Sequence, residues 1–357
     1  MKSNYDILGN HIRLIDTRNR ESITDRVLGI NIDKFFMPSV ANVIGTDLSK
    51  YKLITKGKFA CNPMHVGRDE RLPVALYDEE EPAIVSPAYF MFEVVDNSIL
   101  NEDYLMMWFR RPEFDRICWL HTDGSVRGGI TWDDICRLEL PIPPIEKQLE
   151  IVNSYKAITE RIALKQKIND NLDDTAQTLY QKYFESNSDK SSWKQGTVGD
   201  VLQLQRGHDL PRTEMTGGKY PVAGSTGTIG YHDEFTAEAP VIVMGRSGNI
   251  GNPRLYLCNC WTHNTSLYVK QIYEAEPLWV FYLLKNLNYD GFVGGSAVPT
   301  LNRNDVHAYG IAIPPLELQK SFSQKVMSLI YCKEENLSEI EKLQELQKII
   351  LTTMSSR

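Results

Sequence analysis

The chain has 357 residues, a hydrophobic fraction of 42% and a formal net charge of −7 at pH 7. This length allows two or three domains with cores of their own, and the composition is typical of a folded chain. Apolar stretches stay well below the roughly 18 residues that span a bilayer, and the start is too polar for a signal peptide, so we expect a cytoplasmic protein. No segment is net positive, which argues against a protein that binds DNA alone through phosphates.

Residues 1–142 are expected to form a mixed, mostly β domain, with a helix at 103–109. A long helix is then predicted for 143–185, because Pro143-Pro144 suits a first helical turn. Its apolar residues recur at alternating spacings of four and three, the heptad pattern of a coiled coil. The residues of this pattern are Ile151, Tyr155, Ile158, Ile162, Lys165, Asn169, Leu172, Ala176, Leu179 and Tyr183, of which Lys165 and Asn169 are polar.

The second half of the chain repeats this organisation after a polar linker at 186–192. Residues 193–313 predict another mostly β domain, with strands at 239–244, 255–257 and 266–269 and a helix at 278–287. A second long helix is predicted for 314–357. Its heptad pattern consists of Phe322, Val326, Leu329, Lys333, Asn336, Ile340, Leu343, Gln347, Ile350 and Met354, again with a polar middle at Lys333 and Asn336.

An internal duplication explains this symmetry. The motif Pro-Pro-x-Glu-x-Gln occurs at 143–148 and again at 314–319, 171 residues later, and the same register aligns Ile130 with Leu301. The two domains also open alike, since Leu8-Gly9-Asn10 matches Val198-Gly199-Asp200. Between these shared ends they diverge. We therefore expect an α+β protein in which two mostly β domains are joined by two long helices, packed as an antiparallel coiled coil with a pseudo-twofold repeat.

Extra apolar residues beside the heptad seams make the apolar stripe wider than one partner helix needs. We expect a helix from another subunit to use the surplus; the alternative is that these residues serve only a two-helix core. The candidate interface residues are Ile158, Ile162, Leu164, Ile168, Leu172, Leu329, Leu337, Ile340, Leu343 and Leu346.

Catalytic and metal-binding patterns were sought without success. The run 224–230 is rich in glycine but lacks the Lys-Ser/Thr ending of a phosphate-binding loop and does not enter a predicted helix. Residues 245–249 miss the nucleophile elbow, because Asn249 stands where its second glycine belongs. Cys258, Cys260 and His263 are the one local group of metal ligands, without a second group to complete a zinc site. We predict no catalytic residues, no metal and no cofactor in this chain.

A variable domain that closes on a Gly-Ser segment and continues into an Ile-Pro-Pro-Leu/Ile-Glu-x-Gln helix, all of it duplicated, resembles the specificity subunit of type I restriction-modification systems. The resemblance covers essentially the whole chain. It implies two target recognition domains, each of which reads one half of a split site in double-stranded DNA, held apart by the helix pair. It also implies two methyltransferase subunits, which would bind S-adenosylmethionine, and restriction subunits as partners.

Polar loop residues are the candidates for DNA contacts, because Arg and Asn suit the guanine and adenine edges in the major groove. In the second domain they are Arg206, His208, Arg212, Lys219, Ser225, Thr226, Arg246, Ser247 and Asn249. In the first they are Arg13, Arg18, Asn19, Arg20, His65, Arg68 and Arg127. Residues 295–301 are assigned a structural role.

Two other functions stay open at this stage. The acidic balance also fits a duplicated scaffold or adaptor that binds proteins or glycans without DNA specificity. A standalone enzyme would have to use a serine or cysteine between residues 245 and 260, where we find no base to activate it.

Overall fold

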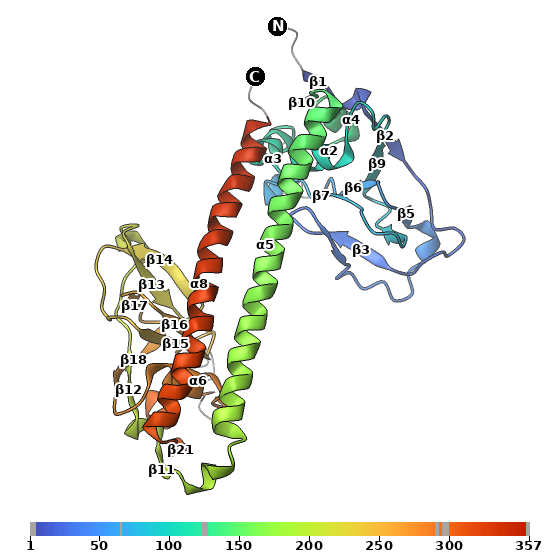
Figure 1. Ribbon diagram of the computed structural model, residues 1–357. Helices are drawn as coiled ribbons and strands as arrows, with labels where there is room; N and C mark the ends of the chain where they lie inside the picture. Colours follow the sequence, from blue (N-terminus) through green and yellow to red (C-terminus); the bar gives the residue numbers. More distant parts are fainter. Residues whose placement is uncertain (1–4, 65, 123–127, 290–292, 295–299, 355–357) are drawn as a thin grey trace. The chain divides into compact units, whose positions relative to one another are not determined.

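The computed structural model describes residues 5–64, 66–122, 128–289, 293–294 and 300–354 (Figure 1). The chain divides into two compact units. Unit 1 contains residues 1–164 and 339–357, and unit 2 contains residues 165–338. Each unit thus takes part of both long helices, a division that differs from the five segments expected from sequence; those domain boundaries stay a prediction.

Unit 1 contains two four-stranded sheets and a two-stranded ribbon. The first sheet has the order β2 (Ile12–Ile15), β9 (Phe90–Val94), β6 (Phe59–Cys61), β7 (Val74–Leu76) and is antiparallel throughout. The second has the order β4 (Phe36–Pro38), β3 (Val27–Ile30), β8 (Ala83–Val85), β5 (Lys52–Ile54), with β3 and β8 parallel. Strand β1 (Tyr5–Ile7) pairs with β10 (Glu139–Pro141).

Four short helices accompany these sheets: α1 (Val66–Asp69), α2 (Glu102–Phe109), α3 (Pro112–Leu120) and α4 (Trp132–Cys136). The core is aromatic, with Phe59 stacked on Phe92 at 5.0 Å between ring centroids and Phe109 edge-on to both. Val152 of α5 and Met354, just beyond α8, belong to the same core. The two long helices are therefore part of the hydrophobic interior of unit 1.

Unit 2 contains a four-stranded sheet, a three-stranded sheet and two ribbons. The larger sheet has the order β12 (Leu202–Arg206), β18 (Ser266–Ile272), β15 (Val241–Gly245), β16 (Gly251–Tyr256) and is antiparallel. The smaller has the order β14 (Gly227–His232), β13 (Tyr220–Gly224), β17 (Trp261–Thr262). The ribbons pair β11 (Lys194–Thr197) with β21 (Gly310–Ile313), and β19 (Val293–Gly294) with β20 (Thr300–Leu301).

Two short helices, α6 (Pro277–Lys285) and α7 (Arg303–His307), complete this domain. Its core again includes residues of the long-helix pair: Phe184 follows α5 and meets Phe322 of α8 at 5.1 Å between ring centroids, while Trp279 of α6 is fully buried beside them. The expected helices at 103–109 and 278–287 correspond to α2 and α6. The α+β class, with mostly β domains and two long helices, is confirmed.

The long helices are α5 (Ile145–Tyr180) and α8 (Leu316–Thr353). Within each unit they lie side by side and run in opposite directions (Figure 1). In unit 1 Arg161 binds Glu339 and Gln347 binds Thr159. In unit 2 the predicted polar interruption is present, where buried Asn336 donates to buried Asn169 at 2.9 Å and accepts from Lys165 at 2.8 Å. Among the described residues no helix combines the length and the hydropathy needed to cross a membrane.

The duplication is preserved in local structure. Helices α4 and α7 begin and end 171 residues apart, and α5 and α8 begin at the same offset. The shared glycine of each domain opening faces the last residue of the equivalent helix: a Cβ atom at Gly9 would lie 2.9 Å from Cys136, and one at Gly199 would lie 3.2 Å from the His307 carbonyl oxygen. Glycine is present in both openings because the backbone passes this close to the helix end.

The glutamine of the repeated motif connects each long helix to the domain before it. Gln148 and Gln319 are 0% and 1% exposed. Gln148 Oε1 accepts from the backbone N–H of Asn101, the N-cap residue of α2, at 2.9 Å, and its Nε2 donates to Pro143 O at 2.8 Å. Gln319 bonds in the same way to Glu276, the N-cap residue of α6, and to Pro314. The motif is therefore a fixed joint between domain and helix.

Replacement of Gln319 by alanine should lower the free energy of unfolding by roughly 1–3 kcal/mol, because the part-buried Glu276 N–H and the buried Pro314 C=O lose their partner. The measurement is urea unfolding followed by tryptophan fluorescence. The matched control is Gln324→Ala, which removes an exposed glutamine from the same helix and should change the stability by less than about 0.5 kcal/mol. Equal effects of the two substitutions would show that the buried glutamine has no special role.

Candidate nucleic-acid interface

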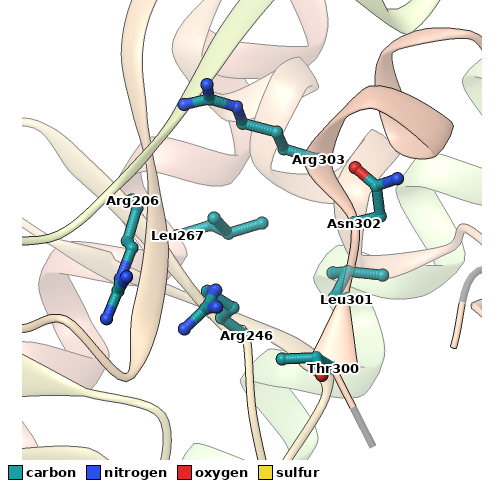
Figure 2. Close-up of a pocket in the computed structure, with 7 residues that line it drawn as sticks. All are labelled: Arg206, Arg246, Leu267, Thr300, Leu301, Asn302 and Arg303. Carbon is teal, nitrogen blue, oxygen red and sulfur yellow. The ribbon is translucent and has the colours of Figure 1, made fainter. Parts of the chain in front are cut away.

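Three arginines from separate parts of the second domain line one surface pocket of about 490 Å³ (Figure 2). Arg206 ends β12, Arg246 follows β15, and Arg303 begins α7. Leu267 and Leu301 form the apolar part of the lining, and Thr300 and Asn302 complete it. In Figure 2 the side chain of Leu267 lies between Arg206 and the segment 300–303. The domain thus gathers cationic side chains around a small apolar floor.

Glycines shape the turn that presents Arg246. Strand β15 ends at Gly245 and β16 begins at Gly251. A Cβ atom at Gly245 would lie 1.5 Å from Asn249 O, so no other residue fits there, and Gly248 and Gly251 have positive φ angles of 78° and 72°. The turn is therefore tight, and its conformation requires these glycines.

Backbone hydrogen bonds hold Arg246 on both sides. Its N–H donates to Thr265 O at 3.1 Å, and its carbonyl accepts from Leu301 N at 2.8 Å. Arg206 is positioned by a second close backbone contact: a Cβ atom on the following Gly207 would lie 2.2 Å from His263 O. Arg206 Nε donates to Asn264 O at 3.3 Å. The backbone of the pocket is thus preformed.

The pocket has uncompensated positive charge. None of the ion pairs that join described residues includes Arg206, Arg246 or Arg303. Burial and the nearby charge of Arg206 lower the pKa of Arg246, which remains protonated because arginine titrates far above neutral pH. An anion or an acceptor-rich ligand would relieve this repulsion.

The adjacent turn between β13 and β14 contains Ser225 and Thr226. Asn249 connects the two turns, because its Nδ2 donates to Ser225 O at 3.2 Å and its Oδ1 accepts from Asn252 at 2.7 Å. The structure therefore gives the Asn249 side chain a positioning role inside the protein. Ser247 donates its backbone N–H to Thr265 O at 3.4 Å, beside Arg246.

The remaining sequence-predicted residues of the second domain lie on its other loops. His208 is exposed, and its ring lies 6.2 Å from those of Trp261 and Tyr268. Arg212 is exposed in a short 3-10 turn (Arg212–Glu214), and Lys219 lies over the Tyr220 ring at 4.7 Å. None of these three lines the arginine pocket.

In the first domain two of the predicted arginines, Arg13 and Arg18, are paired with carboxylates. Arg13 pairs with nearly buried Glu93, and Arg18 donates to Asp16 at 2.8 Å and to Lys50 O at 2.7 Å. Arg20 is exposed. Asn19 is a correction: it is 1% exposed, and its side chain bonds to Thr24 O and Ile23 N within its own turn. An asparagine that is buried and fully bonded has no edge to offer a base.

Three further residues of the first domain cannot be located as candidates. His65 and Arg127 lie outside the described residues. Arg68 is in α1, and only its backbone is described.

Sequence reasoning missed Arg303, Asn302 and His307. All three follow the segment 295–301, to which only a structural role was assigned. His307 Nε2 accepts from the backbone N–H of Leu204 at 2.8 Å, close to an irregularity in the pairing of β12. Burial, and then the charge of Arg303, lower the pKa of His307. The usable signal was an arginine two residues after Leu301, which the repeat aligns with Ile130.

The candidate subunit-interface residues fall into three groups. Ile162 and Ile340 are a correction, because they are 8% and 6% exposed and serve the helix pair itself. Ile158, Leu172, Leu329 and Leu343 are half-buried. Four remain available to a partner, with exposed fractions between 37% and 59%: Leu164, Ile168, Leu337 and Leu346.

The structure also tests the one metal-ligand group noted in the sequence. Cys260 is buried and Cys258 exposed. In the part of the chain that the structure describes, no group of three or more His, Cys, Asp or Glu side chains is placed to hold a metal ion.

Comparison with known proteins shows what the chain is similar to. Residues 190–349 match the family model of the type I restriction modification DNA specificity domain. A putative type I restriction enzyme MjaX specificity subunit from Methanocaldococcus jannaschii is 21% identical to this chain, over 98% of this chain and 88% of that protein.

Two solved structures have similar folds. The S subunit of a type I restriction-modification system from M. genitalium gives a TM-score of 0.63 at 15% identity, over 100% of this chain and 97% of that one. A chain from a study of complex assembly and conformational transition of the type I R-M system gives 0.50 at 16% identity, over 98% and 96%. The resemblance inferred from the repeated helix-start motif is confirmed.

The depressed pKa of His307 leads to a pH-dependent stability. In the window between this pKa and the usual value of about 6.5, the unfolded chain binds the proton and the folded chain does not, so stability falls as the pH falls. His307→Gln keeps an acceptor for Leu204 N–H but removes the titration. Urea unfolding between pH 5 and 8 should show a steeper decline for the wild type than for this variant. Parallel curves would exclude a contribution from His307.

Proposed function

We infer that this chain, which belongs with the specificity subunits of type I restriction-modification systems, supplies DNA sequence specificity to a complex and performs no catalysis itself. The observation that carries this proposal is the arginine pocket of the second domain. Its cations have no carboxylate partner among the described residues, stand at or just beyond the ends of β12 and β15 and at the start of α7, and are held by a preformed backbone. These are the properties of a surface that binds an acceptor-rich polyanion.

We assign one half of a bipartite DNA site to each domain. The support is the contrast between repeated local structure and divergent loops within one chain. The glutamine joint and the glycine contact occur twice, whereas the described lining of the arginine pocket has no carboxylate and the pocket of the first domain mixes its arginines with aspartate and glutamate. Two copies of one architecture with different loop chemistry suit two different sequences. The helix pair then sets the gap between the two half-sites.

Partner subunits are the second part of the proposal. Two methyltransferase subunits, which bind S-adenosylmethionine, dock on the helix pair, and restriction subunits join the complex. The exposed Leu164, Ile168, Leu337 and Leu346 support the docking role, since a partner helix would bury apolar side chains that the helix pair leaves in water. The net charge of −7 supports it as well, because partners would supply many of the phosphate contacts.

Exchange of residues 193–313 for the equivalent domain of another specificity subunit should change one half of the recognised sequence. The other half should stay the same, since the first domain and its joint at Gln148 are untouched. Methylation mapping of cells that carry the complete system measures both halves at once. A change in both halves, or in neither, would contradict the assignment of one domain to one half.

A gel-shift assay with the co-expressed methyltransferase subunit separates this function from that of a scaffold. The expected result is a sequence-specific complex that weakens as salt is raised. No specific complex at any salt concentration would favour the duplicated adaptor.

Lengthening both helices tests the role of the helix pair. One added helical turn in α5 and one in α8, placed beside Leu164 and Ser338 where the two units divide, should alter the gap between the half-sites and leave both half-sequences unchanged. The physical reason is that each turn adds about 5.4 Å of helix. Methylation mapping of the variant gives the new gap, and an unchanged gap would mean that the helices do not set it.

A further inference from the structure

We propose that Arg246 reads a guanine in the major groove, while Arg206 and Arg303 hold the phosphates on either side of it. This inference rests on the proposed function and assigns one base of the half-site read by the second domain. It is drawn from the hydrogen-bonding character of the pocket, from the different anchoring of the three arginines, and from their different exposure.

The described lining of the pocket offers donors. Arginine carries only donors. Asn302, which has both an acceptor and a donor group, already uses its Oδ1 to accept from Asn304 N at 3.0 Å as the N-cap of α7, so only its NH2 group remains. No aspartate or glutamate lines the pocket. Thr300, whose hydroxyl can donate or accept, is the other polar side chain of the described lining. Donors thus outnumber acceptors, and the ligand that satisfies the pocket best presents mainly acceptors.

This donor character selects among the bases. Cytosine presents a donor and needs an acceptor such as a carboxylate, and adenine needs one acceptor and one donor from the protein. Guanine presents two acceptors, N7 and O6, which match the two parallel N–H groups of an arginine. Thymine presents one acceptor. Guanine is thus the base that the pocket satisfies best, and phosphate is the other ligand with the same chemistry.

The three arginines are not equivalent. Arg246 is half-buried at the pocket, and its peptide groups are bonded on both sides, to Thr265 and to Leu301. The glycine turn and the Asn249 contact to Ser225 restrict it further. Base discrimination needs a side chain that a rigid backbone presents, and among the three Arg246 is the one that combines backbone hydrogen bonds on both sides with partial burial. Because Arg246 is half-buried, a phosphate at the protein surface would reach it less easily than it would reach Arg206 or Arg303.

Arg206 and Arg303 have the character of phosphate contacts. Both are exposed. Arg206 is fixed through Nε to Asn264 O and keeps both terminal nitrogens for a ligand, while Arg303 extends from the first residue of α7. In Figure 2 Arg206 lies at the left and Arg303 at the top, while Arg246 lies below Leu267, between Arg206 and Thr300. Phosphate contacts of this kind position a protein on DNA without carrying sequence information.

The test uses the complex with its methyltransferase partner and a library of duplexes in which both half-sites are randomised. Arg246→Gln should lose the preference for guanine at one base pair by roughly 5- to 150-fold, the range for one bidentate contact. Arg206→Gln and Arg303→Gln are matched controls with the same change of charge. Each should weaken all sequences alike and reduce the slope of log affinity against log salt by about 0.9.

The half-site read by the first domain is the internal control for folding, because its selection should be unchanged in every variant. Arg246→Lys is measured as well. It retains the charge and the backbone bonds but lacks the planar fork, so it should discriminate guanine less than the wild type does.

Three results would overturn the assignment. If both Arg246 variants keep every base preference and lose only affinity and salt slope, Arg246 is a phosphate contact. If Arg206→Gln or Arg303→Gln changes the preferred base, the roles are reversed. If the wild-type complex selects no sequence in either half-site, the proposed function fails together with this inference, and that result is distinct from the first two.

Discussion

Each long helix is held to its domain by one buried glutamine side chain, and the rest of the architecture depends on this contact. The side-chain oxygen of Gln148 accepts a hydrogen bond from the backbone N–H of Asn101, the N-cap residue of α2. Gln319 accepts the equivalent bond from Glu276, the N-cap residue of α6. Both side chains also bond to the proline at the start of their own helix. A polar group buried at 0–1% exposure is tolerated only when its bonds are made, so the domain and the helix cannot separate without breaking them.

The pattern of residues predicted the parts of the fold that depend on neighbours in sequence. Helices after Pro143-Pro144 and Pro314-Pro315 follow from the preference of proline for a first turn, and they begin at Ile145 and Leu316. The polar centre of the seam, where Asn169 meets Asn336, was visible as a break in the heptads. Helices α4 and α7 were not predicted, because five residues are too short to show a period.

The candidate site was predicted less well, because side-chain environment depends on residues far away in sequence. Arg13 has a suitable chemistry for DNA, but Glu93, 80 residues later, neutralises it. The polar side chain of Asn19 forms its hydrogen bonds inside its own turn, with Thr24 O and Ile23 N. Arg246 and Arg206 were both chosen from sequence, whereas Arg303 was missed although the repeat marked its position. Loops of similar composition thus differ in whether a carboxylate from elsewhere in the chain already pairs with their arginines.

The uneven pairing of arginines also bears on how the molecule would meet a polyanion. The electrostatic attraction of an unpaired guanidinium for a polyanion extends about one Debye length, roughly 8 Å at physiological ionic strength. A carboxylate partner cancels most of that attraction. The three arginines of the pocket have no carboxylate partner among the described residues, whereas the Arg13–Glu93 pair would have to open before the first domain could use that charge. A contact through Arg13 would therefore carry an added cost, the breaking of a salt bridge, that a contact through the pocket does not.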